Sequence, residues 1–185
     1  MTAYDLPTSL KIGEVDYSIR YGWRAAMDIF AAFNDPDLDQ EMRTEVLLRI
    51  LFPEWQKIPH NLMPEAIKKG CEFLDCGVKP DKKNQPRTMD WEQDAGLIIP
   101  AINAVSGKEV RADPNVHWWT FFGWYMSIDD GLFATVLYLR QKKAKGKKLE
   151  KHEEEFYREN RQLIDLRMPE SEEIRQEKEN ILKWL

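Results

Sequence analysis

An aromatic run over residues 117–126 constrains the fold of this chain more than any other feature. It places six aromatic residues in eight consecutive positions. A short helix cannot bury so many rings on one face, so some of them must meet a second surface. We expect one face to carry Trp118, Phe122 and Tyr125. The other faces then carry Trp119, Trp124 and Met126. Aromatic residues dominate cores and interfaces alike, so the run is either a central core helix, which we favour, or a helix with one face kept for a partner.

Composition describes a highly charged chain with room for one ordinary domain or two small ones. Its 185 residues are 43% hydrophobic and 32% charged, with a net charge of -5. No apolar run approaches the roughly 20 residues of a membrane-spanning helix, and the first residues lack the order of a secretory signal. Two cysteines are too few for a disulfide framework. We therefore expect a cytosolic protein with no membrane partner. The acidic balance argues against nucleic acid, because neutralising phosphates needs a basic face.

Hydrophobic periodicity predicts a mainly α-helical bundle that begins with a short β-hairpin. Apolar residues alternate on both sides of a turn at Gly13, which is typical of a hairpin: Leu10, Ile12, Val15, Tyr17 and Ile19. Helical spacing takes over at Tyr21. It predicts helices over residues 21–34, 37–52, 63–77, 89–106, 117–126, 131–140, 149–166 and 170–185.

The change in character after Arg140 predicts a division into two parts. We expect a helical core domain with the hairpin at residues 1–140, and an extended, charged, helical C-terminal arm at residues 141–185. Residues 78–88 look like an exposed connection, and residues 141–148 look like a basic, flexible linker. The helices beyond it carry thin apolar stripes, which rarely hold a helix to its own domain. Part of the arm is therefore expected to be mobile until it binds a partner.

No pattern in the chain predicts an enzyme, a metal site or a cofactor. His60, His117 and His152 share no metal-ligand spacing, and we expect His117 to cap the aromatic helix or join the core. Cys71 and Cys76 lack the two further ligands that zinc requires. The glycine patterns that bind phosphate are missing, and the paired carboxylates are too common in helical proteins to indicate acid-base catalysis. We predict a protein that binds, with no catalytic residue, metal or cofactor.

Four short motifs occur in a recognisable order. The hairpin and first helix lead to Leu51-Phe52-Pro53, and the segment Asp-Trp-Glu-Gln-Asp-Ala follows at residues 90–95. His117-Trp118-Trp119-x-Phe121 comes next, and then Tyr138-Leu139-Arg140 before a tail rich in Lys and Glu. In this order the chain resembles the bacteriophage family called gene product fifteen, from long-tailed phages and prophages of Gram-positive bacteria. The resemblance runs from about residue 10 to residue 166.

The resemblance implies a tail assembly chaperone. Genes of this family typically lie between those for the tail tube and tape measure proteins, where such chaperones are encoded. A chaperone of this kind coats the tape measure protein in the host cytoplasm and is absent from the finished virion. The tail tube protein is a further candidate partner. An amphipathic helical client needs an apolar groove, which we expect to be lined by Trp118, Trp119, Phe122, Tyr125 and Met126. Self-association would use the hairpin edge at Val15, Tyr17 and Ile19.

Two alternatives stay open at this point. The first is a structural component of a phage or a phage-tail-like particle, which would be present in purified particles. The second is a phage regulator that binds nucleic acid through the six basic residues in 140–148. Solvated charge is the favoured interpretation of that stretch, since acidic residues follow it directly.

Overall fold

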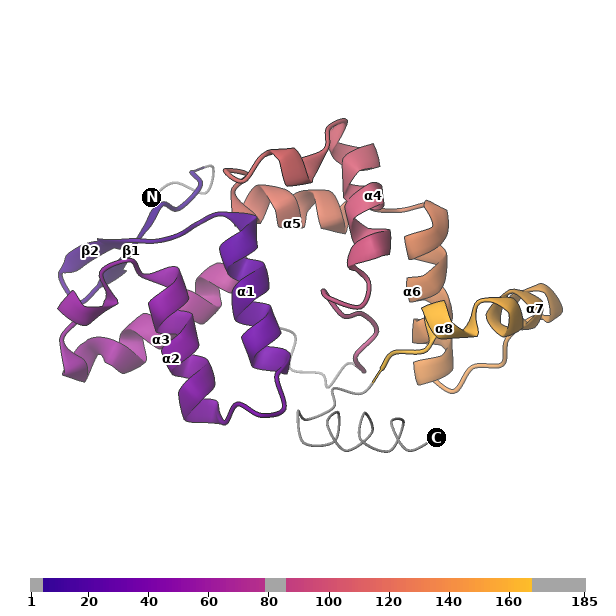
Figure 1. The fold of residues 1–185 in the computed structure, drawn as a ribbon, viewed down its shortest axis with the longest axis horizontal. Helices are drawn as coiled ribbons and strands as arrows, with labels where there is room; N and C mark the ends of the chain where they lie inside the picture. Colours follow the sequence, from indigo (N-terminus) through magenta and orange to yellow (C-terminus); the bar gives the residue numbers. More distant parts are fainter. Residues whose placement is uncertain (1–4, 79–85, 168–185) are drawn as a thin grey trace, which may run out of the picture. The chain divides into compact units, whose positions relative to one another are not determined.

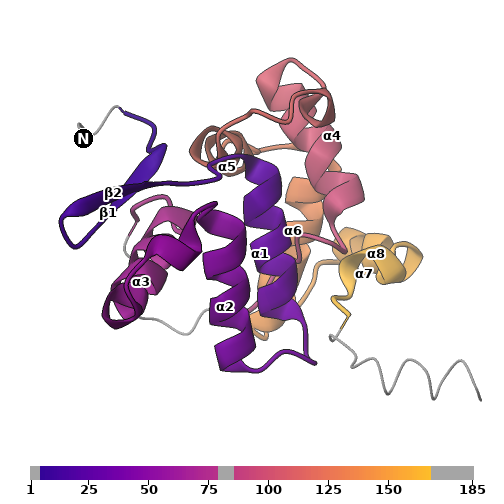
Figure 2. The ribbon, with the colours of Figure 1, turned by 60° about the vertical axis from the view of Figure 1, so that its left-hand side comes forward.

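The computed structural model describes residues 5–78 and 86–167 (Figures 1 and 2). This part of the chain is mainly α-helical, as the sequence predicts, with eight α-helices and one two-stranded sheet. It divides into two compact units, which the described residues 5–78 and 86–167 make up. The division falls in the stretch predicted as an exposed connection, whereas the expected boundary at Arg140 lies inside the second unit. The helix expected over 170–185 lies outside the described residues.

The first unit opens with the predicted hairpin. Strands β1 (Ser9–Ile12) and β2 (Val15–Ser18) pair antiparallel, with Ile12 opposite Val15 and Ser9 opposite Ser18. The turn is Gly13-Glu14, and Gly13 has φ 58°, a conformation that glycine adopts without steric cost. The predicted turn position is therefore confirmed.

Three α-helices complete the first unit: α1 (Trp23–Asn34), α2 (Gln40–Leu51) and α3 (Met63–Leu74). The 3-10 turns η1 (Trp55–Lys57) and η2 (His60–Leu62) join the last two. Asp39 caps α2 by accepting a hydrogen bond from the N–H of Met42 at 2.8 Å. At the C-terminal end of α2, the carbonyl oxygen of Leu51 accepts a hydrogen bond from the N–H of Arg20 at 2.8 Å. The ends of these helices are thus fixed by local contacts.

The core of the first unit is built from aliphatic and aromatic residues, Trp23 among them. Its buried members include Ile12, Ile29, Leu47, Leu51, Phe52, Ala66 and Phe73. Helices α2 and α3 pack closely at Gly70, where a Cβ atom would stand 2.7 Å from Cδ2 of Leu47. A side chain at this position would therefore require Leu47 to shift.

The second unit holds five α-helices: α4 (Ala95–Ser106), α5 (Trp118–Met126), α6 (Gly131–Ala144), α7 (Lys151–Glu159) and α8 (Arg161–Ile164). A 3-10 turn, η3 (Val110–Ala112), lies in the loop before α5. Helix α4 starts later than predicted, because the Asp90 carboxylate accepts hydrogen bonds from the N–H groups of Glu92 and Gln93 and so favours a turn.

Two further predictions for the second unit were wrong in detail. Helix α6 continues beyond Arg140 to Ala144, so the first half of the expected flexible linker is helical. Lysines near a helix C-terminus are favourable, and Lys142 and Lys143 also bind acidic side chains. The helix expected over 149–166 is two helices that meet at Asn160. They pack around a small apolar cluster whose buried members are Val136, Leu139 and Ile164.

Candidate partner-binding helix and its polar support

Helix α5 is the predicted aromatic helix, and His117 begins it. Nδ1 of His117 accepts a hydrogen bond from the N–H of Trp119 at 3.0 Å, and only 6% of His117 is exposed. The first N–H groups of a helix have no partner within the helix, so a side-chain acceptor stabilises the start. The capping role predicted for His117 is confirmed.

One stripe of α5 belongs to the core. It consists of Trp118, Phe121 and Tyr125, which are three and four residues apart and so share a face. Trp118 is 0% exposed and Phe121 is 1% exposed, so Trp118 does not line an open groove. The ring of Trp91 lies edge-to-face on Trp118 at 5.8 Å between centroids and 4.9 Å from the ring of Tyr125. Phe133 of α6 lies 6.0 Å from Tyr125. These contacts fix α5 within its unit.

A second stripe of α5 reaches the surface. It consists of Trp119, Phe122 and Met126, again three and four residues apart. Trp119 and Phe122 are partly exposed, and Met126 is 66% exposed. The ring of Phe122 lies 5.3 Å from that of Trp118, so the outer stripe rests directly on the core stripe. Leu132, which is 48% exposed, follows at the start of α6. The aromatic run thus supplies both a core face and an accessible face.

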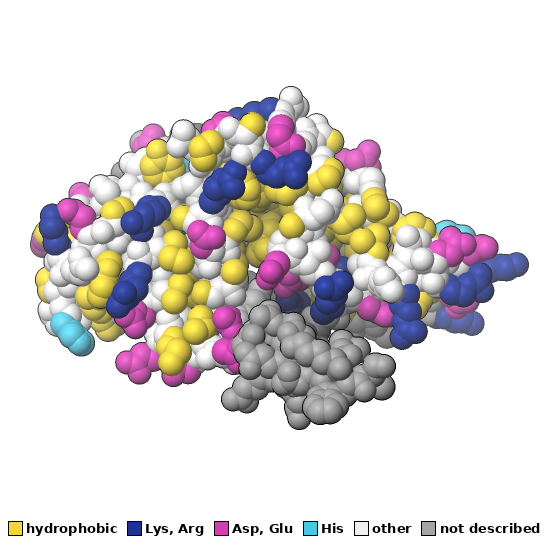
Figure 3. All heavy atoms as spheres, in the orientation of Figure 1, with side chains coloured by type: hydrophobic (Ala, Val, Ile, Leu, Met, Phe, Trp, Pro, Cys, Tyr) yellow, Lys and Arg dark blue, Asp and Glu magenta, His cyan; other side chains and the backbone are white. Residues whose placement is uncertain are grey.

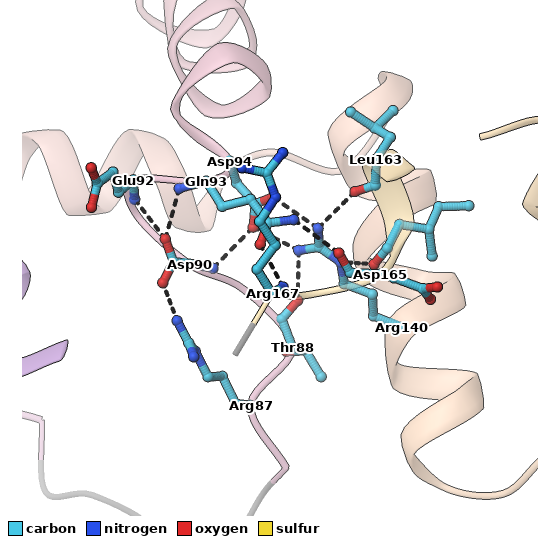
Figure 4. Close-up of polar contacts among 11 residues, drawn as sticks. Arg87, Thr88, Asp90, Glu92, Gln93, Asp94, Arg140, Leu163, Asp165 and Arg167 are labelled. Atoms are coloured by element: carbon cyan, nitrogen blue, oxygen red, sulfur yellow. Dashed lines mark hydrogen bonds and ion pairs between the residues drawn. The ribbon is translucent and has the colours of Figure 1, made fainter. Parts of the chain in front are cut away.

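A buried ion pair joins α6 to the residue before α4 (Figure 4). Nη1 and Nη2 of Arg140 donate to the two carboxylate oxygens of Asp94 at 2.6 and 2.8 Å. The two side chains are 4% and 1% exposed. Arg140 also donates to three carbonyl oxygens, those of Thr88, Leu163 and Ile164. These five hydrogen bonds use all five N–H donors of a guanidinium group.

Gln93 extends this network to the residues after α8. Its Nε2 donates to the carbonyl oxygen of Asp165 at 3.0 Å, and its Oε1 accepts from the N–H of Arg167 at 2.8 Å. We call Gln93, Asp94 and Arg140 the polar hub. Gln93 and Asp94 come from one of the motifs that carry the family resemblance, and Arg140 comes from another. The structure brings these two motifs into direct contact.

The sequence motifs predict no contact between the hub residues. One feature of the sequence nevertheless indicates that Arg140 has a buried partner. Arg140 follows Val136 by four residues and Leu139 by one, so a charge occupies a position of an apolar helical stripe. A charged residue is seldom fully buried unless it is paired. That position therefore calls for an acidic partner elsewhere in the chain, and Asp94 supplies it.

Acidic residues neutralise half of the basic stretch at 140–148. Besides the Arg140 pair, Nζ of Lys142 donates to both carboxylate oxygens of Glu153 at 2.8 and 2.6 Å. Nζ of Lys143 donates to Oδ1 of Asp165 at 2.7 Å. On the face drawn in Figure 3, basic and acidic side chains are interspersed. The stretch therefore offers fewer unpaired cations to phosphate than its sequence indicates.

The three hairpin residues expected at a self-association edge have different surroundings. Val15 is 54% exposed. Tyr17 is half-buried, and its hydroxyl donates to the carbonyl oxygen of Lys57 at 3.3 Å. Ile19 is only 5% exposed. Side chains in a strand alternate between faces, so these three lie on one face, and it is largely turned toward the unit itself.

The part of the chain that the structure describes has no cluster of three or more His, Cys, Asp or Glu side chains placed to hold a metal ion. None of its helices is long and apolar enough to cross a membrane. Cys71 and Cys76 are half-buried thiols that form no disulfide. Burial, followed by the nearby charge of Asp75, raises the pKa of Cys76 to about 12. This thiol is therefore a poor nucleophile at neutral pH.

The sequence matches one protein family. A family model described as Bacteriophage Gp15 protein covers residues 3–166, which include the hairpin, α5 and the polar hub. Comparisons with curated proteins and with solved structures find no match.

Proposed function

We propose, from the premise that this chain belongs to the Bacteriophage Gp15 protein family, that it is a tail assembly chaperone for the tape measure protein. Family membership carries the proposal. Genes of the family typically lie between those for the tail tube and tape measure proteins, where tail assembly chaperones are encoded, and this supports the proposal. The protein would act without catalysis in the host cytoplasm and be absent from the mature virion.

The outer stripe of α5 supports the proposal with a surface suited to a helical client. Amphipathic helices bind by placing apolar side chains three and four residues apart into an apolar surface. Trp119, Phe122 and Met126 offer such a surface, and the flexible, polarisable Met126 adapts to varied side chains. This adaptability matters for a protein that coats a long client with many different segments.

The contacts beneath the outer stripe would lower the entropic cost of binding. Phe122 rests on Trp118, and the ring of Trp91 packs on Trp118 and Tyr125. Trp91 precedes Asp94 by three residues, and Asp94 is held by Arg140. A surface that is ordered before binding keeps more of its contact energy as affinity. We assign the polar hub a supporting role and the outer stripe the contact with the client.

Co-expression with the tape measure protein of the same phage tests the proposal. We expect the client alone to be insoluble, and the two together to give a soluble complex in size-exclusion chromatography. Light scattering then gives the number of copies per client, which should be many. A client that stays insoluble, with no complex formed, would overturn the chaperone role.

The structural-component alternative has its own test. Mass spectrometry of purified phage particles should find the tail tube and tape measure proteins without this chain. Its recovery at a fixed ratio to the tube protein would favour a structural component. The regulator alternative predicts binding to duplex DNA that weakens steeply with salt, and we expect no such binding.

A further inference from the structure

Gly123 is an exposed glycine in the interior of α5 that neither its backbone nor its neighbours require. A glycine inside a helix is less stable than an alanine, so it usually serves either a positive φ or the close approach of another atom. Gly123 has no positive φ, and a Cβ atom added there would meet nothing in the described chain within 4 Å. The space above Gly123 is therefore open.

This open space lies among the three residues of the outer stripe. Counted from Trp119, the residues Phe122, Gly123 and Met126 follow three, four and seven positions later. Four residues with this spacing form one hole on a helix surface, into which a side chain of a facing helix inserts. Three of the four carry large apolar side chains, and Gly123 carries none. We call these four residues the notch.

Two walls of the notch are held in place by the core of the second unit. The ring of Trp119 lies edge-on to that of His117, at 6.1 Å between centroids. The ring of Phe122 rests on that of Trp118 at 5.3 Å. Met126, the third wall, is 66% exposed and has a flexible side chain. The notch is therefore largely formed before anything binds, and one wall can adapt to its occupant.

The chemistry of the notch selects an apolar helix as its occupant. Residues 114–128 contain no Asp, Glu, Lys or Arg, in a chain that is 32% charged. A charged side chain placed against α5 would lose water without gaining a partner. The backbone groups in a helix interior are bonded within the helix, so the notch cannot pair with an extended strand. A helix bonds its own backbone, and it can offer an uncharged face.

We propose that Gly123 sets the specificity of the outer stripe for a client α-helix that inserts one bulky apolar side chain, of leucine size or larger, into the notch. This rests on the proposed function, because it describes how the same surface selects its client. The missing side chain at Gly123 lets the two helix axes approach toward the shorter end of the roughly 8–10 Å range between packed helices. A methyl group at this position would occupy the space of the inserted side chain.

Competitive co-expression of full-length proteins tests the proposal. The wild type and one variant, carrying different affinity tags, are produced together with the tape measure protein of the same phage. Mass spectrometry then compares their ratio in the soluble complex with their ratio in the uncomplexed fraction. Gly123→Ala should be depleted from the complex by roughly tenfold, because adding a methyl group to a packed contact is unfavourable. Gly123→Leu, which fills the notch, should be depleted further.

Gly96→Ala is the matched control. Gly96 is also an exposed helical glycine with nothing within 4 Å, but it lies in the first turn of α4 and no aromatic residue shares its stripe. We expect this variant to enter the complex as the wild type does. A depletion equal to that of Gly123→Ala would overturn the proposal.

Thermal unfolding of the free proteins separates binding from folding. Free Gly123→Ala should be at least as stable as the wild type, because alanine is the better helix former. A damaged fold would then not explain its depletion. Equal incorporation of Gly123→Ala and the wild type would overturn the role of the notch and leave the chaperone role intact. Failure of the wild type itself to form a complex would overturn both.

Discussion

The two units of this chain both carry exposed ion pairs, but the second unit also holds a buried one. In the described part of the first unit, four ion pairs are exposed and join residues three or four apart, as between Arg49 and Glu45. Its buried core is apolar, with aliphatic and aromatic side chains. In the second unit, Arg140 and Asp94 are buried and join segments 46 residues apart. Exposed pairs contribute little to stability, whereas breaking a buried pair leaves an uncompensated charge in the interior. The second unit should therefore be far more sensitive to single polar substitutions.

The composition of the C-terminal helices explains this difference. Helices α7 and α8 bring few apolar side chains to the cluster around Val136 and Leu139. Apolar burial alone would hold them weakly. Arg140 and Gln93 add four hydrogen bonds to the backbone of residues 163–167. The predicted mobile arm is thus attached, as far as Arg167, by polar contacts that its own hydrophobic pattern does not reveal.

Replacing Arg140 should have the largest effect. Arg140→Met leaves the Asp94 carboxylate buried without its partner, so we expect a loss of roughly 3–5 kcal/mol in the free energy of unfolding. The matched control, Arg49→Met, removes an exposed pair and should lose about 0–1 kcal/mol. Urea denaturation of the full chain measures both. Hydrogen exchange should place the Arg140→Met loss in peptides from residues 86–167. Similar losses in the two variants would contradict the contrast between the units.

A glycine pair tests packing in the two units. Gly70→Ala in α3 would push a methyl group against Leu47, so we expect a loss of roughly 1–3 kcal/mol in unfolding free energy. Gly123→Ala in α5 meets nothing within 4 Å, and alanine is the better helix former. It should gain about 0.5–1 kcal/mol. Thermal unfolding of both variants measures the difference, and a stabilised Gly70→Ala would mean that α2 and α3 pack less closely than described.

The helix caps should show no difference between the units. Asp39→Ala in α2 and His117→Ala in α5 each remove a side-chain acceptor from a helix start. We expect each to lose about 1 kcal/mol of unfolding free energy. Asn is a good capping residue, so His117→Asn should recover part of the loss. A much larger loss in His117→Ala than in Asp39→Ala would assign His117 a role in the core beyond its cap.

Lowering the pH should reduce the stability of the second unit through Glu153. We expect this to be the smallest of the effects. The hydrogen bond from Lys142, followed by that from the N–H of Glu150, lowers the pKa of Glu153. A lowered pKa in the folded state adds stability at neutral pH, which is lost as pH falls from about 4.3, the ordinary glutamate value, through the lowered one. Glu153→Gln should flatten the dependence of unfolding free energy on pH in that window. An unchanged slope would show that the Lys142 contact contributes nothing in solution.

The features that the sequence predicted well depend on local patterns. The turn at Gly13 and the cap at His117 both depend on interactions within a few residues along the chain. The polar hub was missed because it joins segments that are distant in the sequence. Contacts of this kind do not appear in the hydrophobic periodicity from which the helices were predicted. The end of α6 was missed for the same reason, since Lys142 and Lys143 find their partners in α7 and after α8.

The aromatic run posed a choice between core and partner surface, and the helix contains both. Spacing correctly separated Trp118 and Tyr125 from Trp119 and Met126. It could not reveal which set is buried, because that depends on Trp91 and Phe133 from other segments. Phe122 was expected on the face of Trp118 and Tyr125, and its ring contacts both, but it is partly exposed and belongs to the outer stripe.

One substitution on the outer stripe tests the proposed function most directly. Met126→Glu places a charge on the apolar surface proposed for the client, at a residue that is 66% exposed. Met42→Glu is the matched control, because Met42 is a 47% exposed methionine on α2 in the other unit. Each variant is co-expressed with the tape measure protein, and the soluble complex is measured by light scattering. We predict that Met42→Glu forms the complex as the wild type does and that Met126→Glu does not. A complex of unchanged stoichiometry with Met126→Glu would contradict the account.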